Sequence, residues 1–244
     1  MTKVKLLCFP YAGGSSAIYN PIDEFLSEKV ELVTMELPGR GTRFPEKTFT
    51  TIDEIVNDAL LWFNEVQPQN YALLGYSMGS IVAYEFYYKL LQNRFKPPQH
   101  MFLAASEPVG ITRKPRGIAQ MSDSEFINFI RNMNGTPEEV FANQELLDII
   151  IPSIRADFLA IDAYNYKPRN LLISCDVTVL AGEYDSISRE NILLWDKYVQ
   201  NGCKYKFFKG DHFFIRDSHK EIAEIINKAL DFECRSPLMN LGTY

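Results

Sequence analysis

Cysteine, histidine and positive charge are all scarce in this chain of 244 residues. Its four cysteines, Cys8, Cys175, Cys203 and Cys234, stand far apart without a Cys-x-x-Cys pair, which argues against a disulfide framework and a zinc cluster. A net charge of -6 argues against a nucleic-acid partner, since such proteins are usually basic. No run of about 18 apolar residues occurs that would cross a membrane, and no signal-peptide apolar region precedes the first proline. We therefore expect a cytoplasmic protein with reduced cysteines, no metal site and no membrane partner.

Short apolar runs alternate along the chain with segments of helical length. Hydrophobic residues make up 46% and charged residues 23%, which is ordinary for one globular domain, here expected over residues 1–244. Alternating strands and helices imply βαβ units and therefore an α/β fold with a mostly parallel, doubly wound sheet. The predicted strands are Val4–Phe9, Val30–Met35, Tyr71–Gly75, His100–Ala105, Val177–Ala181 and Tyr205–Phe208. The predicted helices are Tyr19–Leu26, Ile52–Val66, Met78–Gln92, Arg189–Gln200 and Ser218–Phe232.

The alternation stops between residues 109 and 172, where no strand pattern occurs. Helical pieces are predicted there at Asp123–Met133, Pro137–Phe141, Gln144–Ile151 and Ile154–Tyr164, with Pro152 separating the last two. A helical insertion between two core strands is typical of a lid over an active site. The alternative is a helical subdomain that only extends the core.

One segment, Gly75-Tyr76-Ser77-Met78-Gly79, lies between a predicted strand and a predicted helix. It has the Gly-x-Ser-x-Gly pattern of the nucleophile elbow of α/β-hydrolases, in which a serine stands on a strained turn above the sheet. Glycines two residues before and after the serine let strand and helix approach without a Cβ clash. The pattern predicts Ser77 as a nucleophile; a tight turn without chemistry is the alternative.

A serine nucleophile needs a base, and the chain has only three histidines. His100 opens a predicted strand, where a packed position fits better than catalysis. His219 stands at the start of the last predicted helix, as a surface or capping residue would. His212 lies in the loop between the last strand and the last helix, where an α/β-hydrolase carries its base. We therefore predict His212 as the general base.

The carboxylate that orients this base is expected at the end of a strand, between the serine and the histidine in the chain. Asp185 lies three residues beyond Gly182, which breaks the fifth predicted strand. Glu183 is a weaker rival because its shorter offset from the glycine directs it elsewhere, and Asp176 lies at the wrong end of the strand. Asp185 gives the chain order Ser, Asp, His that α/β-hydrolases follow.

Backbone N–H groups must stabilise the oxyanion that forms when the serine attacks a carbonyl. Met78, which follows the nucleophile, is expected to supply the first N–H. The glycine-containing loop of residues 9–14 is expected to supply the second, because glycine frees the backbone to turn toward the serine. Within this loop we predict Ala12 as the donor, with Tyr11 as the alternative; Pro10 has no N–H. An ordinary strand–helix turn is the other interpretation of the loop.

Four segments together resemble the type II thioesterases that accompany nonribosomal peptide and polyketide synthases. They are residues 7–16, 36–43, 75–79 and 208–214, of which the first two are the most specific to that family. The resemblance runs nearly the full length and includes residues 182–185 and Trp195. Two residues depart from it: Tyr76 stands where the family often has histidine, and Asp211 where it often has glycine. We expect Asp211 to raise the basicity of His212.

The resemblance implies a discrete editing hydrolase. Such an enzyme removes stalled or wrong acyl and aminoacyl groups from the phosphopantetheine arm of a carrier domain, here through an acyl-enzyme on Ser77 that water activated by His212 cleaves. It implies carrier domains of a synthase as partners, a monomer, and neither a metal nor a soluble cofactor. The lid would admit a slim pantetheine arm and a short acyl chain.

The densest basic cluster in this acidic chain begins the predicted lid, at Arg113, Lys114 and Arg116. Carrier domains are typically acidic near their prosthetic group, so these residues are candidates for steering a carrier to the site. A solvated loop with incidental charge is the alternative. Arg40 and Arg43 are candidates for the same entrance, with a purely structural loop as the alternative.

Two rival functions keep the same fold. A carboxylesterase or lipase would act on small oxygen esters, and hydrolysis of a carrier-bound thioester beside p-nitrophenyl acetate distinguishes it. A hydrolase-fold binding protein would have lost catalysis, although such proteins usually lack a member of the triad. Covalent labelling by a fluorophosphonate distinguishes this second rival.

Overall fold

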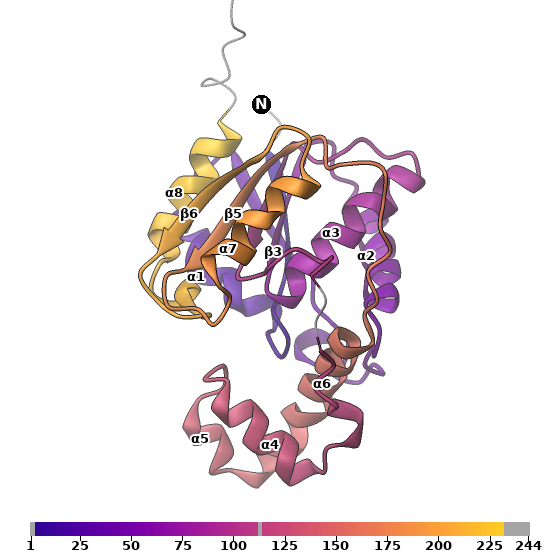
Figure 1. Cartoon of the computed structure of the whole chain (residues 1–244), viewed down its shortest axis with the longest axis vertical. Coiled ribbons are helices and arrows are strands. Elements are labelled where there is room, and N and C mark those ends of the chain that lie inside the picture. The colour runs from indigo at the N-terminus through magenta and orange to yellow at the C-terminus, as the bar shows by residue number, and fades with distance from the viewer. Residues whose placement is uncertain (1–2, 112–113, 232–244) are drawn as a thin grey trace, which may run out of the picture.

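Six parallel strands form the centre of the protein in the computed structural model, which describes residues 3–111 and 114–231 (Figure 1). The strands stand in the order β2-β1-β3-β4-β5-β6, and each neighbouring pair is parallel. Their bounds are β1 Val4–Phe9, β2 Val30–Thr34, β3 Tyr71–Tyr76, β4 His100–Ala104, β5 Asp176–Gly182 and β6 Cys203–Phe208. The chain moves outward from β1 first to one side and then to the other, so the predicted doubly wound parallel sheet is confirmed.

Helices cover both faces of this sheet (Figure 1). Both faces must be covered because successive side chains of a strand point to opposite faces. In β3, Leu73 packs into the apolar cluster on one face, while Ala72 and Leu74 pack into the cluster on the other. The first cluster takes side chains from α2 Ile52–Val66, α3 Met78–Gln92 and α7 Arg189–Leu193. The second takes them from α1 Asn20–Asp23 and α8 His219–Leu230. No helix of the described residues has the length and apolar character to cross a membrane.

Between β4 and β5 the chain forms a separate helical unit. It consists of the 3-10 helix η3 Ile118–Gln120 and the helices α4 Asp123–Asn132, α5 Glu138–Phe141 and α6 Gln144–Ala163. These helices have an apolar cluster of their own, and α4 and α5 stand apart from the sheet at the lower end of Figure 1. The C-terminal part of α6 leads back to the body of the protein.

Helix α6 is continuous, so the helix break predicted at Pro152 was wrong. Leu147, Ile151, Ile154 and Phe158 recur at helical spacing and are all buried in the cluster of the helical unit. A proline inside a helix costs about 3 kcal/mol, because it removes one hydrogen bond and crowds the preceding turn. Packing along this whole face offsets that cost, which the local sequence signal did not reveal.

Two other predicted helices are shorter in the structure. The first consists of the 3-10 helix η1 Ser16–Tyr19 followed by α1. Helix α1 ends before Leu26 because Phe25 N–H and Leu26 N–H donate to carbonyls three residues back, as in a 3-10 turn. In the helix predicted after β5, only the first part is α-helical, as α7, and the second part is the 3-10 helix η4 Leu194–Tyr198. A further 3-10 helix, η2 Gly41–Arg43, follows β2, and η5 Phe214–Arg216 precedes α8.

Candidate active site

Ser77 stands on a strained turn between β3 and α3. Its φ of 53° and ψ of -112° are unusual for a residue other than glycine, and its N–H donates to Ala104 O on β4 at 2.8 Å. A Cβ on Gly75 would lie 2.2 Å from Gly79 O, and a Cβ on Gly79 would lie 2.0 Å from Phe9 O. Only glycine fits at both positions. Ser77 is the N-cap residue of α3 but makes no capping bond, which leaves its hydroxyl directed elsewhere.

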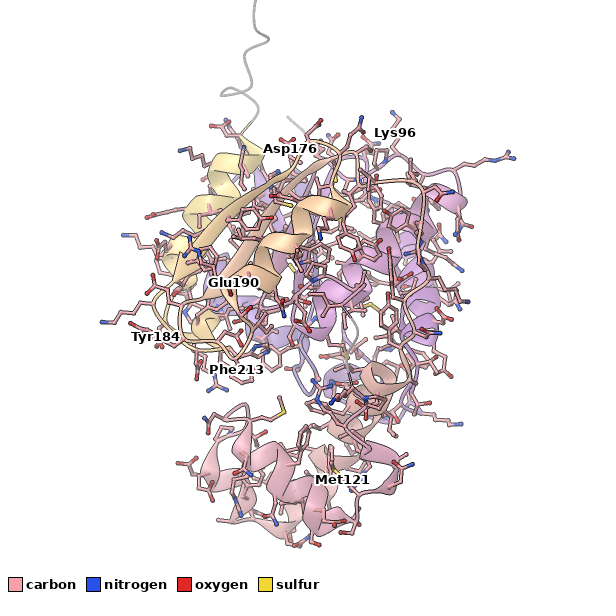
Figure 2. The ribbon with its side chains drawn as sticks, viewed as in Figure 1. Lys96, Met121, Asp176, Tyr184, Glu190 and Phe213 are labelled. Atoms are coloured by element: carbon pink, nitrogen blue, oxygen red, sulfur yellow. The ribbon has the colours of Figure 1, made fainter. Side chains whose placement is uncertain are left out.

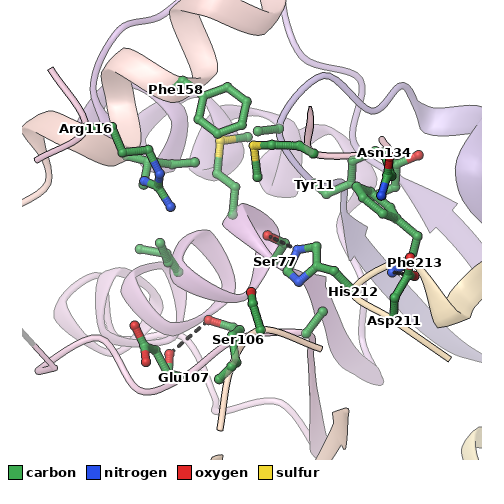
Figure 3. Close-up of a pocket in the computed structure, with 18 of the residues that line it drawn as sticks. Tyr11, Ser77, Ser106, Glu107, Arg116, Asn134, Phe158, Asp211, His212 and Phe213 are labelled. Atoms are coloured by element: carbon green, nitrogen blue, oxygen red, sulfur yellow. Dashed lines mark hydrogen bonds between the residues drawn. The ribbon is translucent and has the colours of Figure 1, made fainter. Parts of the chain in front are cut away.

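The structure brings the three predicted triad residues together. His212 Nδ1 donates to Asp185 Oδ2 at 2.8 Å, which leaves Nε2 to accept from the Ser77 hydroxyl at 3.0 Å (Figure 3). The Asp185 side chain is only 2% exposed, whereas Glu183 is exposed. Asp176 lies at the end of the sheet away from Phe213, the neighbour of His212 (Figure 2).

The two other histidines are placed as the sequence predicts. His100 is buried at the start of β4, where Nε2 lies 2.8 Å from Thr178 Oγ1 and the ring stacks on Phe102. His219 is the first residue of α8. Neither residue lines the cavity that contains Ser77.

Two opposing effects set the charge state of Asp185. Burial raises the pKa of its carboxyl, but the hydrogen bond and the charge of His212 lower it, together with the Ile187 N–H at 3.1 Å. The lowering effects are the stronger, so the pKa of Asp185 lies below its ordinary value. An ionised Asp185 orients the imidazole and stabilises the imidazolium that forms when the base takes a proton.

Both predicted oxyanion donors line the same cavity as Ser77. Met78 is the first residue of α3, so its N–H has no acceptor within the helix. Ala12 lies in a turn in which Gly14 N–H donates to Tyr11 O at 2.8 Å and Gly13 has a φ of 81°. The Tyr11 carbonyl and the Ala12 N–H belong to one trans peptide and point in opposite directions, so the Ala12 N–H points out of the turn.

A cavity of about 680 Å³ surrounds the serine. Figure 3 shows Ser77 and His212 near the centre, with Phe158 and Arg116 above them and Glu107 below. Phe158 is on α6, so the helical unit contributes to the walls together with the loops that follow the strands.

A second, smaller cavity of about 200 Å³ adjoins the first beside the loop of residues 9–14, which carries the predicted oxyanion donor Ala12 and is called the oxyanion loop below. The two share Tyr11, Ala12, Met133, Phe158 and Phe213 as lining residues. The rest of the second wall is mostly aliphatic and comes from the helical unit, including Ile130, Val140, Ile150 and Ile154.

The described part of the basic cluster also reaches the larger cavity. Lys114 is exposed and lines it, and so does Arg116, whose guanidinium lies 3.5 Å from the Asp162 carboxylate. Arg116 is thus partly neutralised by Asp162. Arg113 lies outside the described residues.

The structure gives the contacts of two arginines and one aspartate that the sequence analysis considered near the site. Arg40 and Arg43 do not face the entrance: Arg40 is 8% exposed and bonds to Asp157, while Arg43 bonds to Glu46 and Asp58. Asp211 lines the cavity, and its carboxylate accepts a hydrogen bond from Phe213 N–H at 2.7 Å. This hydrogen bond goes to the backbone of the same loop.

Sequence reasoning missed the role of Tyr76. This side chain is 1% exposed at the end of β3, and its hydroxyl donates to His212 O at 2.7 Å and accepts Ile215 N–H at 3.4 Å. Burial raises the pKa of Tyr76, so the hydroxyl stays protonated and remains a donor. A tyrosine that ends a fully apolar strand was the available signal, because a buried hydroxyl needs a partner.

Comparison with known proteins places these features in a wider group. Residues 4–230 match the thioesterase domain family. The gramicidin S biosynthesis protein GrsT of Aneurinibacillus migulanus is 30% identical over 232 residues, which cover 93% of this chain and 89% of that protein. ClbQ from the colibactin NRPS/PKS pathway has a similar structure, with a TM-score of 0.89 at 27% identity over 94% of this chain and 97% of that one. The type II thioesterase BorB from the borrelidin biosynthetic cluster gives a TM-score of 0.85 at 28% identity, over 94% of each chain.

Proposed function

Because this chain belongs to the thioesterase domain family, we propose that it hydrolyses acyl and aminoacyl thioesters carried on the phosphopantetheine arm of a carrier domain. It is a thioester-hydrolysing enzyme with the α/β-hydrolase fold, and its relatives include type II thioesterases of NRPS/PKS pathways. The observation that carries the proposal is the hydrogen-bonded chain from Ser77 through His212 to Asp185 inside a cavity large enough for a ligand.

Acylation begins when Ser77 Oγ attacks the thioester carbonyl and His212 Nε2 takes the hydroxyl proton. The carbonyl oxygen becomes an oxyanion, which the N–H groups of Met78 and Ala12 stabilise. When the tetrahedral intermediate collapses, the C–S bond breaks and the imidazolium returns its proton to the departing thiolate. The products of this half-reaction are the free thiol of the pantetheine arm and an ester on Ser77.

Deacylation repeats these steps with water as the nucleophile. His212 removes a proton from water, the resulting hydroxide attacks the serine ester, and the proton returns to Ser77 Oγ as the acid leaves. The side chains of this chain supply the nucleophile, the base and the oxyanion donors, so the proposed reaction involves no metal and no soluble cofactor. The cytoplasmic location and the monomeric state expected from the sequence stay predictions.

The cavity gives the carrier-bound substrate a plausible path. The phosphopantetheine arm carries a phosphate, and the larger cavity has Lys114 and Arg116 in its wall. The acyl group lies at the other end of the arm and must reach Ser77, and the apolar second cavity adjoins the larger one beside the loop that carries Ala12. We assign the basic wall to the arm and the carrier, the apolar cavity to the acyl group, and the helical unit to the lid.

The test compares acetyl- and aminoacyl-phosphopantetheinyl carrier protein with p-nitrophenyl acetate for the wild type and for Ser77→Ala. We expect a higher kcat/KM for the carrier-bound thioester and its loss in Ser77→Ala. His212→Gln should lose activity in the same way, while His219→Gln, which changes a histidine outside the cavity, should keep it.

Other outcomes would change the proposal. Turnover of p-nitrophenyl acetate alone would point to a carboxylesterase of small oxygen esters. No turnover of either substrate, together with no labelling by a fluorophosphonate, would favour a binding protein.

A further inference from the structure

A buried ion pair joins the helical unit to the oxyanion loop. Asp157 on α6 receives Arg40 Nη1 on Oδ2 at 2.6 Å and Arg40 Nη2 on Oδ1 at 2.8 Å, with side-chain exposures of 3% for Asp157 and 8% for Arg40. The same Asp157 Oδ2 also accepts Gly13 N–H at 2.7 Å, and Arg40 Nη1 donates to Gly14 O at 3.1 Å. Each partner of the ion pair therefore also holds the backbone of the loop that carries Ala12.

The helix presses on this loop at one further point. A Cβ on Gly13 would lie 2.9 Å from Ile154 Cγ1, one turn before Asp157 on α6. Gly39, next to Arg40, also has a positive φ of 81°, and a Cβ on it would lie 3.7 Å from Ser153 Cβ on the same helix. One face of α6 thus contacts two glycine turns, one after β1 and one after β2.

The turn needs such support because it contains two consecutive glycines. Glycine gives the chain access to the positive φ at Gly13, but it also gives the loop many other conformations. The direction of the Ala12 N–H depends on which of them is adopted, since this N–H points out of the turn only while Tyr11 O faces Gly14 N–H. The bonds from Asp157 to Gly13 and from Arg40 to Gly14 hold the turn in that state.

We propose that Asp157 and Arg40 are positioning residues that keep the Ala12 N–H aimed at the oxyanion, so that lid helix and oxyanion hole form one unit. This inference rests on the proposed use of Ala12 as an oxyanion donor. In this proposal the hydrogen bonds to Gly13 and Gly14 affect turnover. The ion pair between Arg40 and Asp157 would by itself only attach α6 to the rest of the protein.

These two roles separate in a double replacement. Arg40→Met with Asp157→Leu removes both charges and fills the space with apolar side chains, which often maintains or increases stability, whereas removing one partner leaves an unpaired buried charge. We expect Asp157→Leu and Arg40→Met alone to lower the Tm and the double variant to recover most of that loss. The double variant still lacks partners for Gly13 N–H and Gly14 O, so its kcat should stay about 100-fold below the wild type, on the scale of losing one oxyanion donor.

A transition-state analogue gives the specific readout. A short-chain trifluoromethyl ketone forms a hemiketal oxyanion with the serine, so its Kd should rise by about the same factor as kcat falls, while KM stays within about three-fold. Arg155→Met is the matched control, because Arg155 lies on α6 like Asp157, bonds to Asp123 on α4 and does not line the catalytic cavity. Its kcat and its analogue affinity should equal those of the wild type.

Two results would overturn the inference. One is a double variant with wild-type Tm whose kcat lies within three-fold of the wild type; the other is a loss of kcat with unchanged affinity for the ketone. If the double variant does not fold, Gly13→Ala tests the same turn with the ion pair intact, and an unchanged kcat there would equally overturn it. All these ratios are measured with both p-nitrophenyl acetate and a carrier-bound thioester, so a wrong substrate proposal appears as wild-type inactivity toward the thioester alone.

Discussion

Removing the hydroxyl of Tyr76 tests how the catalytic histidine is held in place. In Tyr76→Phe the ring and its contacts with Tyr11 and Phe214 are kept, and only the bonds to His212 O at 2.7 Å and Ile215 N–H at 3.4 Å are lost. The stronger bond reaches the backbone of the histidine itself. The substitution therefore changes the support of His212 without changing the triad or the cavity.

The size of the effect follows from burial. Tyr76 is 1% exposed, and its loss leaves the His212 carbonyl with an unmet hydrogen bond, which costs about 1–3 kcal/mol. Part of this cost lowers the stability of the fold, and part appears when the histidine shifts from its position beside Ser77. If about 1.4 kcal/mol falls on the transition state, kcat decreases about tenfold. KM should stay within about two-fold, because Tyr76 does not line the cavity.

The assay measures kcat and KM with a thioester substrate, together with the unfolding free energy from urea denaturation. Tyr88→Phe is the matched control, because Tyr88 is also buried and donates to a backbone carbonyl, Leu171 O, at 2.6 Å. It should lose a similar amount of stability and keep its kcat. If both variants lost stability equally and both kept kcat within two-fold, Tyr76 would be only a packing residue and our reasoning on His212 would be wrong.

Three further predictions follow from the site. The pKa of Asp185 is lower in the folded protein than the unfolded-state pKa of about 3.9, so ionised Asp185 stabilises the fold above that pH. The unfolding free energy should therefore fall as the pH drops below about 4, and Asp185→Asn should make this fall less steep. An equal pH dependence in the wild type and the variant would contradict the prediction. Ile150→Trp should fill the smaller cavity and shift preference from medium toward short acyl thioesters, whereas the exposed neighbour Ile149→Trp should leave the chain-length profile unchanged. Reversing the charges of Lys114 and Arg116 should raise KM several-fold for a carrier-bound thioester and not for a small soluble thioester. Equal effects on the two substrates would refute carrier docking at Lys114 and Arg116, and so would the same effect from two charge reversals on α8.

The residues that meet in the site were predictable because each follows a local rule. The serine lies in a five-residue pattern between strand and helix, and only three histidines compete for the role of base. The aspartate follows the only glycine that ends a strand in that part of the chain. These signals depend on neighbouring residues and chain order, which the sequence contains in full.

The supports of the site were not predictable in this way. Tyr76 and His212 are 136 positions apart, and Arg40 and Asp157 are 117 apart. No periodicity connects such residues, and a tyrosine or an arginine near a motif has many potential partners. For Arg40 the sequence left an entrance position and a structural loop open, because it did not show that α6 covers this residue; the structure has the second.

The sequence by itself determined the order of strands and helices along the chain and the parallel sheet, and it predicted which serine, histidine and aspartate meet in the site, since these follow from apolar periodicity and from the chemistry of a few rare residues. Only the tertiary structure decided that α6 runs unbroken through Pro152 and that its Asp157 meets Arg40 and Gly13. The physical reason is that burial sets both results. A continuous apolar face outweighs the cost of one proline, and a carboxylate removed from water requires partners that packing brings from distant parts of the chain.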